Sequence, residues 1–204
     1  MVIGGPRGPD RVRPLREVLT ATGAGLYLAN HVAGPIPAET MAAVHESDEM
    51  ELRVGRVGPG RPDDLDQRDK EARAVVAAVL KASPERIVLT HGVADAARAV
   101  ATVVLVARAA DERRVVLVQG LAAPVEAAVR VAAEATGATV DVVPEPPQIL
   151  AADVALLVLA HVDADGRLAD GAHASEPARK SGARVMLDAS LSVGAIPTDA
   201  EALR

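Results

Sequence analysis

The sequence predicts an α/β fold in which a mainly parallel sheet is covered by helices on both faces, as a three-layer sandwich. From residue 86 onwards, short runs of β-branched and aliphatic residues are separated by turns and by segments with apolar residues at helical spacing. One run, Val154–Ala160, is apolar throughout, which is typical of a parallel strand buried on both faces. These two observations favour a doubly covered parallel sheet.

The second part of the chain therefore carries five candidate strands, separated by helices. The strands are expected at Arg86–Thr90, Arg114–Val118, Thr139–Val143, Val154–Ala160 and Ala183–Leu187. The segment "VADAARAVATVVLVARA" after the first strand is expected to be helical. The helix after the second strand has Pro124 in its first turn and ends near Gly137.

The first part of the chain is expected to be helical without strands. A short helix around Leu15–Leu19 precedes an extended piece, "GAGLYLAN", and Pro37 begins a helical pattern that runs to about Arg53. After a loop rich in Gly and Pro, a further helix should bury one apolar face. That face consists of Ala72, Val75, Val76, Val79 and Leu80.

Composition restricts the functional classes. Half of the 204 residues are hydrophobic, but Phe and Trp are absent, so Ala, Val and Leu must fill a closely packed interior. The net charge of −6, without a basic cluster, does not indicate a nucleic-acid or anionic-membrane surface. The absence of Cys removes disulfides and thiolate catalysis, and no apolar run approaches the roughly 20 residues of a membrane span. A cytoplasmic protein is expected.

Polar residues follow three of the candidate strands, where ligands bind in open α/β sheets. These residues are Thr90, His91 and Gly92, then His161 and Asp163, then Asp188, Ser190 and Ser192. In "VLTHGVADAA" a strand leads through Gly92 into a helix start, which offers free N–H groups to an anion. The alternative is that Gly92 only permits a tight turn.

The polar residues after the other two strands indicate different roles, a turn in one case and a ligand site in the other. The loop "HVDADGRLADG" fails the calcium-loop pattern because Leu168 and Ala174 stand where Gly and Glu are needed, so a solvated turn is expected. Asp188 ends an apolar strand, where a carboxylate must be paired or coordinated. A turn or cap role is the alternative. The small residues around Asp188 favour a ligand beside it.

Four segments, taken together and in order, resemble a known family. "GLYLANHVAGPIPAE", "VLTHGVADAA", "LVLAHVDADGRL" and "ARVMLDASLSVGAIPTD" resemble the first half of class V aminotransferase-fold enzymes, which depend on pyridoxal phosphate (PLP). Cysteine desulfurases, isopenicillin N epimerase-like proteins and ergothioneine-type carbon–sulfur lyases belong to this group. The resemblance runs from about Tyr27 to Leu203. It implies one incomplete PLP-transferase large domain, residues 1–204, with residues 1–36 as an N-terminal arm.

The resemblance also implies a cofactor site. Asp188 matches the family's Asp that binds the pyridine nitrogen, and the segment from Gly92 to Ala94 matches the phosphate loop. Asp95 stands where the family has Glu. The implied PLP-binding residues are His91, Gly92, Val93, Ala94, Asp188 and Ser190, and no catalytic residue or metal ligand is assigned.

Several family positions are occupied by different residues. Ala94 replaces a Thr hydroxyl of the phosphate loop, Leu191 replaces a Gln, and Leu121 stands where a His or aromatic covers the ring. The segment "HVDADG" also lacks the family's Asn. His91 or Ser192 are candidates to supply some of these contacts.

The family's Schiff-base lysine has no counterpart near Asp188. The three lysines are Lys70, Lys81 and Lys180, and none is expected at a strand end. In the implied fold, two strands that follow the Asp188 strand would separate it from the phosphate-loop strand, so a four-strand group and an isolated strand with unpaired edges are expected.

The leading hypothesis is therefore the N-terminal subunit of a split PLP-dependent enzyme. It would act on an amino acid or an amino-acid-derived sulfur compound, with the lysine on a second polypeptide, and PLP binding could require that partner. A catalytically inactive PLP-fold binding or regulatory subunit, a homo-oligomer and a truncated product without function are the alternatives.

Overall fold

The computed structural model describes residues 18–19 and 34–201. The helix expected around Leu15–Leu19 and the extended piece after it fall largely outside the described residues. The chain divides into two units, Met1–Asp66 and Gln67–Arg204, and each unit is described by itself.

The first unit contains helix α2, Ala38–Val54, and the start of helix α3, Arg61–Leu80. Helix α2 begins directly after Pro37, as the sequence predicts. The buried guanidinium of Arg61 donates to Glu51 and to Asp64, each at 2.7 Å, and thereby ties the end of α2 to the beginning of α3. Hydrogen bonds from Arg61 and Arg56 hold the pKa of Glu51 below its usual value.

The apolar face expected on α3 is buried only in part, since Val76 and Leu80 are half-buried and Ala72, Val75 and Val79 are exposed. Val75 is 66 % exposed and Val79 is 52 % exposed, whereas the buried residue of this stretch is Ala77. The prediction was partly wrong, because helical spacing identifies an apolar stripe, but burial of the stripe also needs a partner. In the described part of the chain, no helix is long and apolar enough to cross a bilayer.

The second unit is built on a four-stranded parallel sheet in the order β2-β1-β3-β4. Strand β1 is Arg114–Val118, β2 is Thr139–Val143, β3 is Val154–Ala160 and β4 is Arg184–Asp188. Every residue of β3 is buried, as its continuous apolar run predicts. Four of the five expected strands are therefore present.

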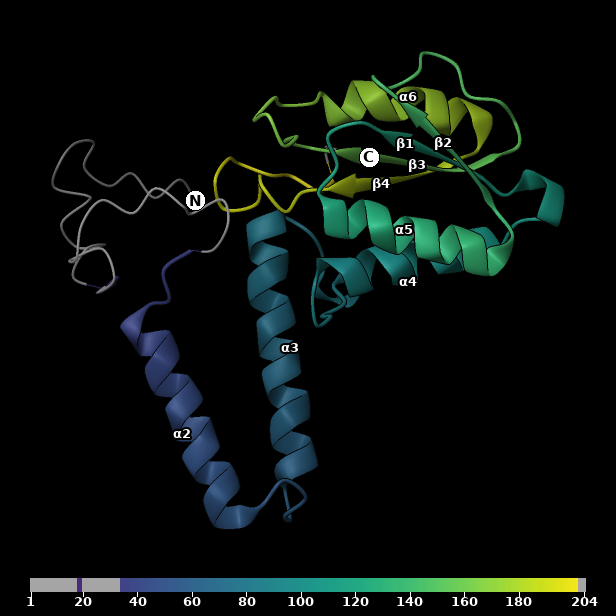
Figure 1. Ribbon diagram of the computed structural model, residues 1–204. Helices are drawn as coiled ribbons and strands as arrows, with labels where there is room; N and C mark the ends of the chain where they lie inside the picture. Colours follow the sequence, from purple (N-terminus) through teal and green to yellow (C-terminus); the bar gives the residue numbers. More distant parts are fainter. Residues whose placement is uncertain (1–17, 20–33, 202–204) are drawn as a thin grey trace, which may run out of the picture. The chain divides into compact units, whose positions relative to one another are not determined.

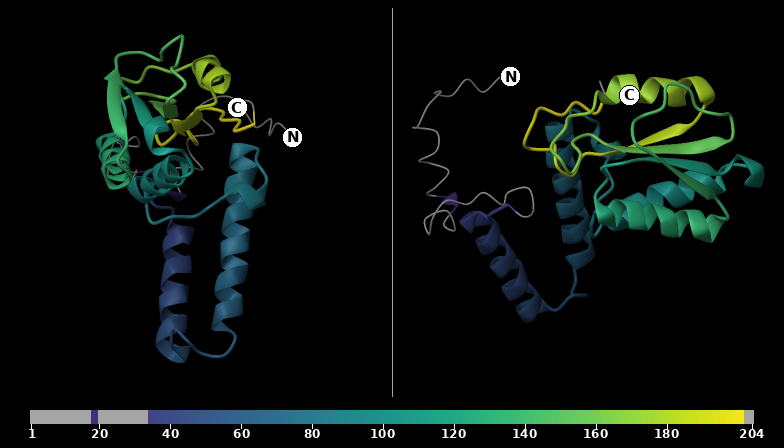
Figure 2. Two further views of the ribbon diagram at one scale, coloured as in Figure 1. Left: turned by 90° about the vertical axis from the view of Figure 1, so that its right-hand side faces the viewer. Right: turned by 45° about the horizontal axis from the view of Figure 1, so that its top comes forward.

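Helices cover both faces of this sheet (Figures 1 and 2). Helices α4, Val93–Val106, and α5, Ala123–Thr136, lie on one face, and α6, Gly171–Ser181, lies on the other. Small residues bring helices and sheet close together, since Ala101 of α4 and Ala178 of α6 are both fully buried. The three-layer α/β architecture is confirmed.

The fifth expected strand, Arg86–Thr90, is not a strand. A short 3₁₀ helix, Pro84–Arg86, leads into residues 87–90, which pair with none of the described strands. Val88 is 81 % exposed and Leu89 is 45 % exposed. A strand exists only through hydrogen bonds to a neighbour, so this β-branched run stays irregular without one. The result matches the four-strand group and isolated segment that the family resemblance implies.

The loops after β1 and β3 are joined at the carboxyl ends of the strands. Asp163 Oδ1 accepts hydrogen bonds from the amides of Asp165 and Arg167, at 2.9 and 2.8 Å, which confirms the expected turn. The amide of Ala164 donates to the carbonyl of Gly120 at 3.2 Å. Gly120 has φ +93°, and a Cβ there would lie 2.8 Å from Asp163 Cβ. Only glycine fits this contact.

We predict that Gly120→Ala lowers the free energy of unfolding by about 2–4 kcal/mol, because it combines left-handed backbone strain with steric overlap. Gly137→Ala is the matched control, since Gly137 has φ +70° but nothing within 4 Å of the added Cβ. The control should lose about 1–2 kcal/mol. Urea unfolding followed by circular dichroism measures both variants, and equal losses would contradict the close contact with Asp163.

Candidate functional site

A groove of about 390 Å³ lies between the carboxyl end of β4 and the first turns of α4. Its lining is apolar except for Asp188 and Ser190. The lining residues are Val93, Ala96, Ala97, Val100, Val125, Met186, Leu187, Asp188, Ala189, Ser190 and Val193. The structure thus brings together three of the six predicted cofactor-binding residues, namely Val93, Asp188 and Ser190.

Asp188 is the last residue of β4 and is half-buried. Its Oδ1 accepts hydrogen bonds from the amide and the hydroxyl of Ser190. Within residues 34–201, no group bonds to its Oδ2. One carboxylate oxygen of Asp188, Oδ1, therefore stabilises the turn, while the other oxygen, Oδ2, remains available to a ligand in the groove. The two interpretations from the sequence are compatible.

The turn after Asp188 is anchored by a buried pair, His161 and Ser192, which the sequence did not indicate as a pair. His161 Nδ1 lies 2.9 Å from Ser192 Oγ, and the two side chains are 6 % and 0 % exposed. Ser192 Oγ donates its only proton to the carbonyl of Ala189 at 3.1 Å, so Nδ1 of His161 carries the proton between them. The amide of His161 also donates to the carbonyl of Asp188 at 2.8 Å.

This pair corrects one expectation. Ser192 cannot replace a lost cofactor contact, because its hydroxyl is committed to His161 and Ala189 in the interior. The only indication of this pair in the sequence was that His161 and Ser192 are polar residues that follow β3 and β4, respectively. Proximity in space became visible only with the pairing of β3 and β4.

The start of α4 forms the other end of the groove. Gly92 precedes the helix with extended backbone, φ 170°, and no side chain caps the helix. The first amides of a helix have no partner within it, so those of Val93 and Ala94 are free for a ligand. The side chains of His91 and Ala94 are exposed and do not line the groove. Asp95 pairs with Arg98 on its own helix at 3.3 Å.

The positions that differ from the family do not face the groove. Leu121 is 9 % exposed and packs in the core beside α5, and Leu191 is 37 % exposed. Lys81 pairs with Asp199 at 3.1 Å and Lys180 pairs with Glu176 at 2.8 Å, and the pKa of Glu176 is lowered by that lysine. None of the three lysines lines the groove.

The fold and the site define a class of α/β proteins that hold a ligand where parallel strands end and a helix begins. More specifically, the chain belongs to the aminotransferase class-V family, whose model matches residues 26–204. The resemblance seen in the sequence is confirmed, and PLP is the cofactor of this family. No curated protein matches the chain significantly.

Solved structures share the fold. A C-DES variant with glycine covalently linked to its PLP cofactor matches with a TM-score of 0.81 and 17 % identity, over 93 % of this chain and 53 % of that one. A cysteine desulfurase from Thermococcus onnurineus NA1 gives 0.74 and 19 % identity, over 98 % and 52 %. The Escherichia coli cysteine desulfurase CsdA gives 0.70 and 21 %, over 98 % and 53 %. The chain spans about half the length of these structures.

We predict that Ser192→Ala loosens the turn after Asp188. The change leaves the buried Nδ1–H of His161 without its partner, whereas the carbonyl of Ala189 still accepts from the amides of Ser192 and Val193, each at 3.0 Å. An unpaired buried donor should cost about 1–2 kcal/mol. Ser190→Ala is the control, because Ser190 is exposed and its loss should stay within about 0.5 kcal/mol. Thermal unfolding and amide hydrogen exchange of residues 189–194 measure the effect. Equal stability of the two variants would contradict the anchoring role of the buried pair.

Proposed function

We propose that this chain is the N-terminal half of a PLP-dependent class V enzyme and that a second polypeptide completes its active site. The observation that carries the proposal is the groove itself. It has a carboxylate at one end, Asp188, and the free amides of a helix N-terminus at the other, beside Val93. These are the two kinds of group that a protonated pyridine nitrogen and a phosphate require.

Each predicted residue has a definite role in this proposal. Oδ2 of Asp188 accepts a hydrogen bond from the protonated pyridine nitrogen, while Ser190 holds Oδ1 and so orients the carboxylate. The amides from Gly92 to Ala94 bind the phosphate, with His91 next to them at the surface. When bound, PLP supplies an electron sink for bond cleavage in an amino-acid substrate.

The open sheet supports a second polypeptide. Strand β4 pairs with β3 along one edge only, and residues 87–90 pair with no described strand. Apolar side chains are exposed on the unpaired segment, where Val88 is 81 % exposed, and in the groove beside β4, where Val100 of α4 is 45 % exposed. Unpaired backbone groups beside exposed apolar surface favour association. The same polypeptide would supply the Schiff-base lysine. A second copy of the chain is the alternative partner.

The similar structures support the proposed substrate class. One further neighbour is described as a cystine C–S lyase in complex with its product cysteine persulfide, with a TM-score of 0.73 and 18 % identity. Together with the cysteine desulfurases, it favours an amino acid or an amino-acid-derived sulfur compound as substrate. The absence of Cys in the chain fits a reducing compartment such as the cytoplasm.

The absorbance of PLP tests the shared site. PLP is added to the purified chain alone and together with the polypeptide encoded by the adjacent gene. We expect an absorbance band of bound PLP that requires the second polypeptide. Asp188→Ala should weaken PLP binding about tenfold or more, since a hydrogen bond to a charged group contributes about 1.5–3 kcal/mol.

Asp111→Asn provides the control for this experiment. Asp111 lies before β1, so the carboxylate removed there belongs to the opposite ends of the strands. This variant should bind PLP as the unchanged chain does. If no band forms with or without the second polypeptide, the split-enzyme proposal fails and the inactive binding subunit becomes the better explanation.

A further inference from the structure

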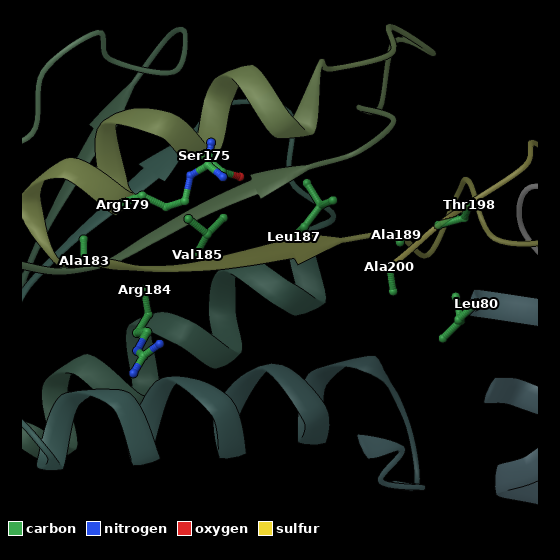
Figure 3. Close-up of a pocket in the computed structure, with 10 residues that line it drawn as sticks. All are labelled: Leu80, Ser175, Arg179, Ala183, Arg184, Val185, Leu187, Ala189, Thr198 and Ala200. Atoms are coloured by element: carbon green, nitrogen blue, oxygen red, sulfur yellow. The ribbon is translucent and has the colours of Figure 1, made fainter. Parts of the chain in front are cut away.

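A second, larger groove runs along the open edge of β4, on the side of α6 (Figure 3). Its volume is about 720 Å³. One end, where β4 begins, is lined by Arg179 and Arg184, and the other end is lined by Leu80 and Ala200. The groove therefore follows the whole unpaired edge of the strand.

The shape and backbone of this edge suit an added strand. All three strand pairings of the sheet are parallel, and helices cover both faces, which is the usual setting of a parallel sheet. A further strand in this position would take up the free N–H and C=O groups of β4. In the parallel orientation its first residue would lie beside Arg184.

The middle of the edge is apolar on both faces. Val185 and Leu187 pack towards α6, and Met186 packs towards α4 and α5. Because neighbouring residues in a parallel pair face the same side, an added strand needs apolar side chains throughout its middle. A polar segment would bury groups without partners there.

Charge distinguishes the two ends of the groove. Among the ten residues that line it, Arg179 and Arg184 are the only charged ones, and both lie where β4 begins. Figure 3 shows Arg179 on α6 and Arg184 extending away from α6, on the opposite face. Arg108 adds a third cation nearby, through its bond to the carbonyl of Gly182, although Glu112 lies 3.7 Å from it.

We propose that the open edge of β4 receives an extended segment of a second polypeptide that runs parallel to β4, has an apolar middle and begins with an acidic residue in register with Arg184. The guanidinium of Arg184 is exposed and bonds to no group of residues 34–201. An aspartate or glutamate beside it gives a cross-strand ion pair at the rim of an otherwise apolar contact. This inference rests on the proposed completion of the sheet by a second polypeptide.

Fluorescence anisotropy with three synthetic peptides tests this recognition on the full chain, without PLP. The peptides have about six residues and the same apolar middle. They differ in carrying Asp at the first position, Lys at the first position, or Asp at the last position. At low salt the peptide with Asp first should bind about tenfold more tightly than each of the others.

Arg184→Glu should reverse the preference between the Asp-first and Lys-first peptides. Arg184→Gln should abolish the preference while preserving folding, and circular dichroism checks that both variants fold. Arg167→Glu is the matched control, since Arg167 is exposed on the loop after β3 at the other ends of the strands. The order of the three peptides should be unchanged in this control.

Three results would overturn the inference: equal binding of the three peptides, tightest binding of the peptide with Asp last, or no binding of any peptide. Tightest binding with Asp last would indicate an antiparallel segment instead. Because no cofactor is present, this experiment is independent of the PLP absorbance measurement. If the three peptides bind in the expected order of affinity but no PLP band forms, the docking of an acidic strand is supported and the proposed cofactor function is not.

Discussion

The free edge of β4 is the constraint on which the candidate site and the proposed second polypeptide both depend. The N–H and C=O groups along an unpaired strand edge are open to a further strand, and β4 has one neighbour, β3, in the described sheet. Asp188 ends this same strand, so the carboxylate of the candidate site lies at the boundary where the sheet stops. The groove beside Asp188 and the groove along β4 are consequently two sides of one gap.

The parts of the site that the chain builds by itself are fixed by local hydrogen bonds. Ser190 holds one oxygen of Asp188, and the buried pair His161 and Ser192 anchors the turn that follows. Gly120 and Asp163 join the neighbouring loops by direct contact. The pair His161 and Ser192 satisfies buried polar groups within the chain. The geometry around the carboxylate is therefore fixed by contacts of this chain alone. The groove beside Asp188 itself is not covered by any other part of the described chain.

Sequence reasoning succeeded where the structure depends on local pattern. Strands β1 to β4, the three covering helices and the strand-end position of Asp188 followed from periodicity and from a family motif. It failed where the outcome depends on a distant neighbour. Arg86–Thr90 has the composition of a strand but lacks the pairing, and the apolar stripe of α3 lacks burial at Val75 and Val79. The bond between His161 and Ser192 joins residues 31 positions apart, which no local pattern reveals.

The charge of Arg184, at the beginning of β4, would determine which residue of an added strand lies beside Asp188, at the end of β4. A slip of one residue would turn every side chain of an added strand to the opposite face, so the register of that strand has to be specified. The apolar middle of the edge specifies it poorly, because Val185, Met186 and Leu187 accept apolar partners on both faces. An ion pair with Arg184 would specify the register directly.

Since Arg184 and Asp188 lie four residues apart on the same face, an acidic first residue beside Arg184 brings the fifth residue of the added strand beside Asp188. The groups that complete the cofactor site would then come from the fifth residue onwards, so the same contact that selects the partner would also align it with the carboxylate.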